Sequence, residues 1–379
     1  MSFIGFSTTH TGSLPRPPDV AWLVFAAAEA GMPAAADEDV LGSAVTDVVE
    51  RQRRLGLGRM NDGEITRLRY WDVFTKRVNG IEPFVDEHPS RAATGRFAGY
   101  EPPLLTVPAY PVPSERLGRM PVVRGPLVYR GPVGLDAEVD RLRTALGADP
   151  GFLTAPSPGM LALTCRDDYY RDEELLLAAA ARVLAEEYRF VADSGLVLQV
   201  DSPDLPVCLR GHPAAEGRAT ARLRLDALRR ALQGISAEQV RLHVCWGNSE
   251  GPHDEDVELQ EFADLLLAMP VGALVLEAAN PRHAHEWRLW GELDLGDKQL
   301  IVGAIDTTTN FVEHPDLVAD RLCQFASVVD PSRLVAGTDC GFGTWAHFFR
   351  VHPSVAWAKL ESLVEGARRA SRRLTAVPA

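Results

Sequence analysis

Three absences limit what this chain of 379 residues can do. No apolar run is long enough to cross a bilayer, because the Ala-rich stretch at 21–36 is interrupted by Glu29 and Pro33. Basic residues are not in excess: 39 Lys and Arg stand against 52 Asp and Glu, and the net charge of -13 repels phosphate backbones. We therefore expect no membrane and no nucleic acid among its partners.

Cysteine is also scarce. The five cysteines are few for this length and odd in number, which favours reduced thiols over a disulfide scaffold. The first eleven residues lack the basic and then apolar pattern of a secretory signal. We expect a cytoplasmic protein, in which two thiols that converge on one surface serve metal binding or catalysis. The sequence leaves room for a homo-oligomer.

The chain does contain a series of short apolar runs separated by helical patterns, an alternation that predicts a parallel sheet of the α/β class. The predicted strands cover 6–10, 57–61, 152–155, 195–201, 241–246, 271–277, 300–306 and 334–337. The main predicted helices cover 37–54, 172–194, 214–232, 256–268, 316–329 and 355–374. Eight strands favour a (β/α)8 TIM barrel over an open doubly wound sheet.

One segment does not follow this alternation. Residues 101–134 are rich in Pro and Gly and contain two short strand patterns, at 120–124 and 126–129. We interpret the segment as a hairpin inserted between the second and third strands. No linker separates two cores, so we predict a single barrel domain over residues 1–379.

Four residues of metal-binding type follow the predicted strands. His243 and Cys245 lie one residue apart, so a period of two places both side chains on one face of their strand. Glu277 and Cys340 end two further strands. One imidazole, two thiols and one carboxylate suit a tetrahedral Zn2+ ion. The alternative is a structural zinc or unrelated buried thiols, but structural sites favour Cys-x-x-Cys pairs, which are absent.

Other strands also end in polar residues, where barrel enzymes carry their active sites. These residues are His10, Ser13, Asp62, Glu64, Asp201 and Asp306. Each has a structural alternative. Glu64 and Asp201 can be salt-bridged carboxylates at the barrel mouth, His10 a hydrogen-bonded core histidine, and Asp306 the cap of the next turn.

These residues resemble those of the cobalamin-independent methionine synthase family, in the barrel that forms its catalytic half. The resemblance runs from residues 8–17 to residues 339–344. Between them it includes Asp62-Gly63-Glu64 with Arg67, Val200-Asp201 with Pro203, His243-Val244-Cys245, Glu277, and Gly303 to Asp306. The match is to the short, single-barrel branch, which is related to the epoxyalkane–coenzyme M transferases.

The resemblance implies that His243, Cys245, Glu277 and Cys340 bind zinc. It also implies that Glu64 and Asp201 hold the amino group of a thiol amino acid, and that the turn from Thr11 to Ser13 holds its carboxylate.

Long members of the family carry a proton-transfer histidine after the Asp of the seventh strand, but residues 307–310 contain none. Candidates to protonate a leaving group are therefore His10, which we prefer, His253 and Asp306. Trp246 is a candidate wall for a ring or a short alkyl chain.

The predicted ligand set favours sulfur chemistry. Two thiolates and a carboxylate make zinc electron-rich, which leaves a bound thiolate nucleophilic, whereas three neutral imidazoles activate water better. We expect a zinc-dependent transferase that moves a methyl or other alkyl group, for example from a methylated folate, onto homocysteine or another small thiol. Alternatives are thiolate ring opening as in epoxyalkane–coenzyme M transferase, a metal-dependent hydrolase on the same barrel, and a non-catalytic zinc-binding partner protein.

Overall fold

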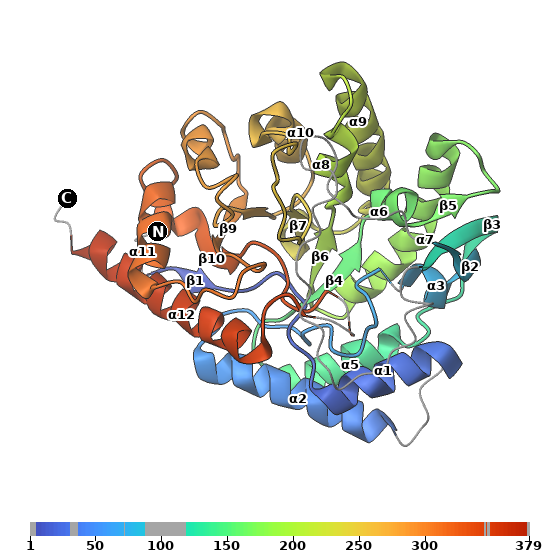
Figure 1. Ribbon diagram of the computed structural model, residues 1–379, viewed down its shortest axis with the longest axis horizontal. Helices are drawn as coiled ribbons and strands as arrows, with labels where there is room; N and C mark the ends of the chain where they lie inside the picture. The colour runs from blue at the N-terminus through green and yellow to red at the C-terminus, as the bar shows by residue number, and fades with distance from the viewer. Residues whose placement is uncertain are drawn as a thin grey trace.

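A curved sheet of parallel strands forms the centre of the molecule, with helices around its outside (Figure 1). The computed structural model describes residues 5–30, 37–71, 73–87, 119–344, 346 and 349–376. Seven strands pair in the order β1-β10-β9-β8-β7-β6-β4. Their bounds are Ser7–Thr8 (β1), Phe152–Pro156 (β4), Val197–Asp201 (β6), Val240–Val244 (β7), Ala273–Glu277 (β8), Gln299–Ile305 (β9) and Leu334–Thr338 (β10).

Residues 57–61, the predicted second strand, lie between the two edges of the sheet but do not form a regular strand. The amide of Gly58 donates to the Thr8 carbonyl of β1 at 2.9 Å. On its other side, Met60 forms an isolated parallel bridge with Gly151, directly before β4. The segment therefore joins the two edges of the sheet, and the fold is a (β/α)8 barrel, as the alternation of patterns predicts.

The predicted helices are present, and the structure adds others, of which the longest lie at 18–30 and 135–146. The longer ones are Pro18–Ala30 (α1), Asp37–Leu55 (α2), Leu135–Leu146 (α5), Glu173–Asp193 (α7), Ala214–Ala231 (α9), Pro315–Ala326 (α11) and Pro353–Thr375 (α12). The shorter ones are Val73–Arg77 (α3), Pro158–Thr164 (α6), Asp204–Leu209 (α8) and Ala263–Leu267 (α10). The helix predicted at 256–268 is thus only the short α10 and a preceding 3-10 turn. None of the described helices combines the length and apolar character that a bilayer-spanning segment needs.

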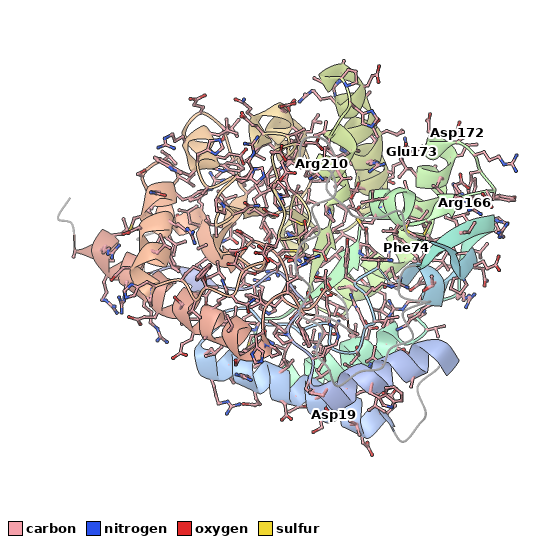
Figure 2. The ribbon with its side chains drawn as sticks, in the orientation of Figure 1. Asp19, Phe74, Arg166, Asp172, Glu173 and Arg210 are labelled. Carbon is pink, nitrogen blue, oxygen red and sulfur yellow. The ribbon has the colours of Figure 1, made fainter. Side chains whose placement is uncertain are left out.

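The start of α7 shows why these helices begin where they do. The Asp172 carboxylate accepts a hydrogen bond from the Leu175 amide at 3.0 Å, which caps the first turn. Glu173 and Glu174 add negative charge at the positive end of the helix dipole. Figure 2 shows Asp172 and Glu173 together at this end of the helix. The apolar face of α7 then packs on the sheet.

The inserted hairpin differs in its pairing from our prediction. Residues 120–124 and 126–129 form one continuous strand, Arg119–Tyr129 (β3), and do not pair with each other. The antiparallel partner of β3 is Val78–Glu87 (β2), which lies upstream of the predicted segment. A short third strand, Arg166–Asp167 (β5), runs parallel to β3. The predicted stretch 101–118 lies outside the described residues.

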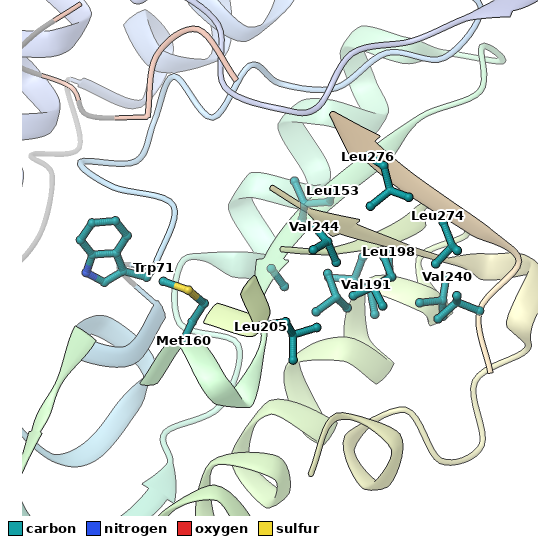
Figure 3. Close-up of a cluster of buried hydrophobic side chains, with 14 of the residues drawn as sticks. Trp71, Leu153, Met160, Val191, Leu198, Leu205, Val240, Val244, Leu274 and Leu276 are labelled. Atoms are coloured by element: carbon teal, nitrogen blue, oxygen red, sulfur yellow. The ribbon is translucent and has the colours of Figure 1, made fainter. Parts of the chain in front are cut away.

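Alternate residues of the barrel strands build the core, and this alternation positions the site. Figure 3 shows Leu198 of β6, Val240 and Val244 of β7, and Leu274 and Leu276 of β8 packed together with Val191 of α7. Because side chains alternate along a strand, the residues between these apolar positions face the barrel interior. Asp201 and His243 are among them, and they are neighbours in the register of β6 and β7.

A buried ion network joins the segment before the hairpin to α5 and α7. The Arg67 guanidinium contacts the Glu138 carboxylate at 2.9 Å, and Arg77 contacts Glu138 at 2.7 Å and Glu187 at 2.6 Å. The side chains of all four residues are no more than 7% exposed. Burial opposes ionisation of Glu138, but Arg67 and Arg77 outweigh it and lower its pKa to about 2.

We expect Glu138→Ala to lower the free energy of unfolding by about 3–5 kcal/mol, because it leaves two buried guanidinium groups without this carboxylate. Denaturant unfolding followed by circular dichroism measures the change. The matched control is Glu50→Ala, which removes an exposed partner of Arg53 and should cost less than about 1 kcal/mol. Equal losses in the two variants would contradict the structural importance of the buried network.

Candidate metal centre and substrate pocket

Three of the four predicted metal ligands meet at the C-terminal ends of the strands. His243 lies in β7, Cys245 follows β7, and Cys340 follows β10. One ligand atom from each lies within 4.8 Å of the other two, and all three residues are buried. Among the residues that the structure describes, no other group of three such side chains lies this close.

The donor atoms of these three residues fit zinc. The sulfurs of Cys245 and Cys340 are 3.9 Å apart and form no disulfide. A tetrahedral zinc ion with Zn–S bonds of about 2.3 Å separates two sulfurs by about 3.8 Å. The hydrogen bond with Cys340, together with burial, raises the pKa of the Cys245 thiol. Two thiolates in this dry site therefore need a cation to be stable.

The histidine of the group is held by a carboxylate behind it. His243 Nδ1 lies 3.0 Å from Asp201 Oδ1, and Nε2 lies 3.3 Å from the Asp339 carbonyl oxygen. A ring that donates from Nδ1 to Asp201 would keep Nε2 as the electron-pair donor for a metal. Gln199 also donates to Asp201 Oδ1, at 2.7 Å. Asp201 thus orients a metal ligand from the neighbouring strand.

Glu277 ends β8 beside this group but is not part of it. Its Oε1 accepts a hydrogen bond from the Trp246 amide at 3.0 Å, and its Oε2 accepts one from Asn280 Nδ2 at 3.0 Å. Burial raises the pKa of its carboxyl, and the nearby His283 opposes this effect. Zinc ligation by Glu277 stays a prediction, and in this structure the carboxylate has other partners.

A second buried carboxylate faces Asp201. Glu64 Oε1 accepts a hydrogen bond from Thr154 Oγ1 at 2.8 Å, whereas its Oε2 has no partner within the described residues. Burial raises the pKa of Glu64 to about 7; the charge of Asp201 adds to this effect and that of Arg67 opposes it. An unpaired buried acceptor beside a second acid is a site for a cation.

The turn that the family resemblance assigns to a substrate carboxylate lies against Glu64. A Cβ on Gly12 would lie 2.6 Å from Glu64 Oε1, so the approach of this acid requires glycine. Within the turn, the amide of Thr11 donates to Thr338 Oγ1 and that of Gly12 to His10 Nδ1. The amide of Ser13 has no partner among the described residues, which leaves it as an open hydrogen-bond donor.

His10 has the geometry of its structural alternative. Nδ1 accepts from the Gly12 amide at 3.2 Å, and Nε2 lies 2.8 Å from Gln52 Oε1. Burial lowers its pKa to about 3, so the ring is neutral and both of its nitrogens are engaged. We therefore do not retain His10 as the acid that protonates a leaving group.

Asp306 likewise fits its structural alternative. Its two oxygens accept hydrogen bonds from the backbone and hydroxyl groups of Thr308 and Thr309. Burial alone would raise its pKa, but these hydrogen bonds outweigh burial and lower it. Asp306 is an ionised cap of the loop after β9, with no proton to donate near neutral pH.

Trp246 is not placed as a substrate wall. Its ring stacks on His283 with centroids 3.8 Å apart, its Nε1 donates to the Val257 carbonyl at 2.7 Å, and it is 2% exposed. The strand alternation that brings His243 and Cys245 into the barrel puts Trp246 on the opposite face. Its backbone amide, which holds Glu277, is the part of this residue near the site.

Two further histidines share one acid behind Trp246. Asp256 Oδ2 lies 2.5 Å from His253 Nδ1 and 3.2 Å from His283 Nε2. The other ring nitrogen of His253 lies 2.8 Å from the Ser249 carbonyl, so both of its nitrogens face acceptors. His283 is 2% exposed and flanked by Asp256 and Glu286.

Three positioning residues escaped the sequence analysis: Thr154, Gln199 and Asn280. Thr154 and Gln199 are polar residues inside otherwise apolar strands, a signal that marks an inward-facing position. Asn280 follows Glu277 by three residues, a spacing that carries no general signal outside a helix.

A barrel with a buried His, Cys and Cys group at its C-terminal strand ends has the arrangement of an enzyme with a candidate thiol-rich metal site. The sequence matches a protein-family model, described as "Cobalamin-independent synthase, Catalytic domain", over residues 112–367. The chain belongs to this family of enzymes.

Relatives match along nearly the whole chain. A methionine synthase of Sulfolobus acidocaldarius is 24% identical over 365 residues, which cover 95% of this chain and 90% of the relative. An uncharacterized protein of Bacillus subtilis, YxjH, is 23% identical over 95% of this chain and 93% of its own length. Among solved structures, a B12-independent methionine synthase from Shewanella sp. W3-18-1 in complex with selenomethionine superposes with a TM-score of 0.76 at 23% identity, and covers 98% of this chain and 100% of its own. This likeness supports the same barrel fold.

Proposed function

We propose that this enzyme is a zinc-dependent transferase that moves a methyl group onto the thiol of an amino acid, with homocysteine as the first candidate acceptor. The observation that carries the proposal is the position of Asp201. It lies 3.0 Å from His243 of the metal-binding group, and it is near enough to Glu64 for its charge to raise the pKa of that acid. A thiol and an ammonium group of one small molecule can therefore be bound together.

The chain supplies a partner for each end of such a molecule. His243, Cys245 and Cys340 would hold zinc, with Glu277 within reach at the end of the adjacent strand. Zinc held by these donors lowers the pKa of a thiol that joins them. Glu64 and Asp201 bind the ammonium group as ionised acids, and the Ser13 amide donates to the carboxylate.

The charges in the pocket separate this proposal from its alternatives. A thiol with a sulfonate, as in the epoxyalkane–coenzyme M transferases, would place its anion near the two acids Glu64 and Asp201, which is unfavourable. A hydrolase needs a metal that activates water strongly, and a donor set with two thiolates is poor at this. We propose a methylated folate as the donor on the basis of the family alone.

The test is to add thiols to the zinc-loaded protein and measure the metal environment by X-ray absorption. We expect about one zinc per chain and an additional sulfur neighbour with homocysteine. 2-Mercaptoethanesulfonate, which lacks the ammonium group, should need a concentration at least tenfold higher. Preference for the sulfonate would favour the epoxide-opening alternative, and exchange of oxygen neighbours alone would favour the hydrolase. Production of methionine from homocysteine and a methylated folate then identifies the donor.

A further inference from the structure

Each oxygen of the Glu277 carboxylate accepts a hydrogen bond, and neither donor group belongs to one of the three metal-binding side chains. Two N–H groups, the Trp246 amide and Asn280 Nδ2, each lie 3.0 Å from one of its oxygens. The residue is 8% exposed, so water contributes little to its solvation. Two donors on a buried carboxylate stabilise its ionised form.

The orientation of Asn280 is set by its other hydrogen bonds. Its Oδ1 accepts from the Arg282 amide at 3.0 Å, so its Nδ2 must be the atom that points toward Glu277. Its backbone amide donates to Asp339 Oδ2 at 2.7 Å. The side-chain amide of Asn280 is therefore already oriented to donate to the Glu277 carboxylate.

The same loop is tied to the strand end that carries a metal donor. Asp339 Oδ1 accepts from the amides of Ala278 and Ala279 at 2.8 and 2.9 Å. Asp339 immediately precedes Cys340 in the chain, as Cys245 immediately precedes Trp246. Both donors to Glu277 thus have a fixed place relative to the two metal-binding cysteines.

We propose that Asn280 is a positioning residue that, with the Trp246 amide, holds Glu277 in a position off the metal and so leaves a coordination place for the thiol of the substrate. This inference rests on the proposed function, and it adds that Glu277 and the substrate thiol compete for that place. A thiol that binds there as a thiolate would give its proton to solvent, and Asn280 and the Trp246 amide would hold the Glu277 carboxylate in the position that the structure shows. The number of negative ligands is unchanged, which keeps the charge of the buried site constant.

The test uses the full chain loaded with cobalt(II), whose absorption reports each sulfur that joins the metal. Asn280→Ala removes one hydrogen bond to an ionised group from the off-metal position only. We expect the apparent Kd for homocysteine, measured from the sulfur-to-cobalt absorption, to rise about tenfold or more. Metal removal by a chelator should become slower, because Glu277 stays on the metal for longer.

Two further variants make the test specific. Asn280→Asp keeps the acceptor for the Arg282 amide but repels Glu277. It should therefore weaken thiol binding at least as much as Asn280→Ala. If Asn280→Ala does not fold, the thiol Kd of Asn280→Asp provides the test. The matched control is Asn310→Ala: within the described part of the chain, the hydrogen bonds of the Asn310 side chain go to Arg350 and His352 in another loop. It should leave both measurements unchanged.

A double-mutant cycle shows whether Asn280 acts through Glu277. In a Glu277→Ala background, Asn280→Ala should have no further effect on the thiol Kd. An undiminished effect in that background, or an unchanged Kd in Asn280→Ala itself, would overturn the role of Asn280 while the proposed function stands. If the unaltered protein takes up cobalt but shows no thiol-dependent absorption, the proposed function fails, and this role fails with it.

Discussion

Replacing Cys340 with Ala is expected to lower zinc affinity at least a hundredfold and to leave the purified protein with less than about a tenth of an equivalent of metal. Cys340 supplies one of three donors that lie within 4.8 Å of one another. Loss of an outer partner of a ligand already costs about 10- to 100-fold in metal affinity, and loss of a ligand itself costs more. The remaining Cys245 thiol would then be buried without a cation, so it should stay protonated.

The measurement is the metal content after dialysis against a chelator, by plasma mass spectrometry. Cys323→Ala is the matched control: this cysteine is half-buried in α11 and lies outside the metal-binding group. It should retain the same zinc content as the unaltered protein. A full equivalent of zinc in Cys340→Ala would remove the basis for the metal centre and for the transferase built on it.

Affinity for an amino-acid thiol is expected to fall about tenfold for each pH unit below 7, because of Glu64. Its pKa is raised to about 7, first by burial, so the acid carries a proton below this pH. An ammonium group pairs with the ionised form, and binding must then release that proton. One pKa unit corresponds to about 1.4 kcal/mol, which sets the slope. Above pH 7 this contribution is constant.

Two controls separate this effect from the ionisation of the thiol itself. For a thiol without an amino group, the slope of the logarithm of the affinity against pH should be smaller by one over the same range, because no proton is released from Glu64. Glu64→Gln, which keeps the size and the acceptor for Thr154 but never ionises, should bind homocysteine at least tenfold more weakly at pH 8 and lose the additional slope. Isothermal titration in buffers of different ionisation enthalpy counts the protons directly. If the pH dependence of homocysteine affinity is unaltered in Glu64→Gln, Glu64 does not bind the ammonium group.

The parts of the site that the sequence predicts are those that depend on strand periodicity. A period of two brings His243 and Cys245 to one face, and parallel strands bring Cys340 to the same end of the barrel. The same rule applied to Trp246 puts its ring outside the barrel, so its assignment to the substrate site conflicts with the alternation that identified the metal ligands.

What the sequence does not reveal depends on contacts between distant segments. The partner of β3 starts more than 30 residues upstream, so local patterns at 120–129 could not identify it. The pairing of His10 with Gln52, and of His283 with Asp256 and Glu286, decides whether a histidine is neutral or charged. Such pairings have no periodic signature, so the sequence alone could not assign the role of either histidine.

Because the barrel closes irregularly, its two sides support the residues of the site by different kinds of strand pairing. Strands β7, β8 and β10, which carry His243, Glu277 and the approach to Cys340, are each paired on both sides. Glu64 instead follows the seam at 57–61, which is joined to its neighbours by an isolated bridge and a few amide bonds. Local opening of that seam would draw Glu64 away from Asp201 without disturbing the three metal donors. The three candidate metal ligands thus lie at the ends of regularly paired strands, whereas Glu64 depends on a less regular seam.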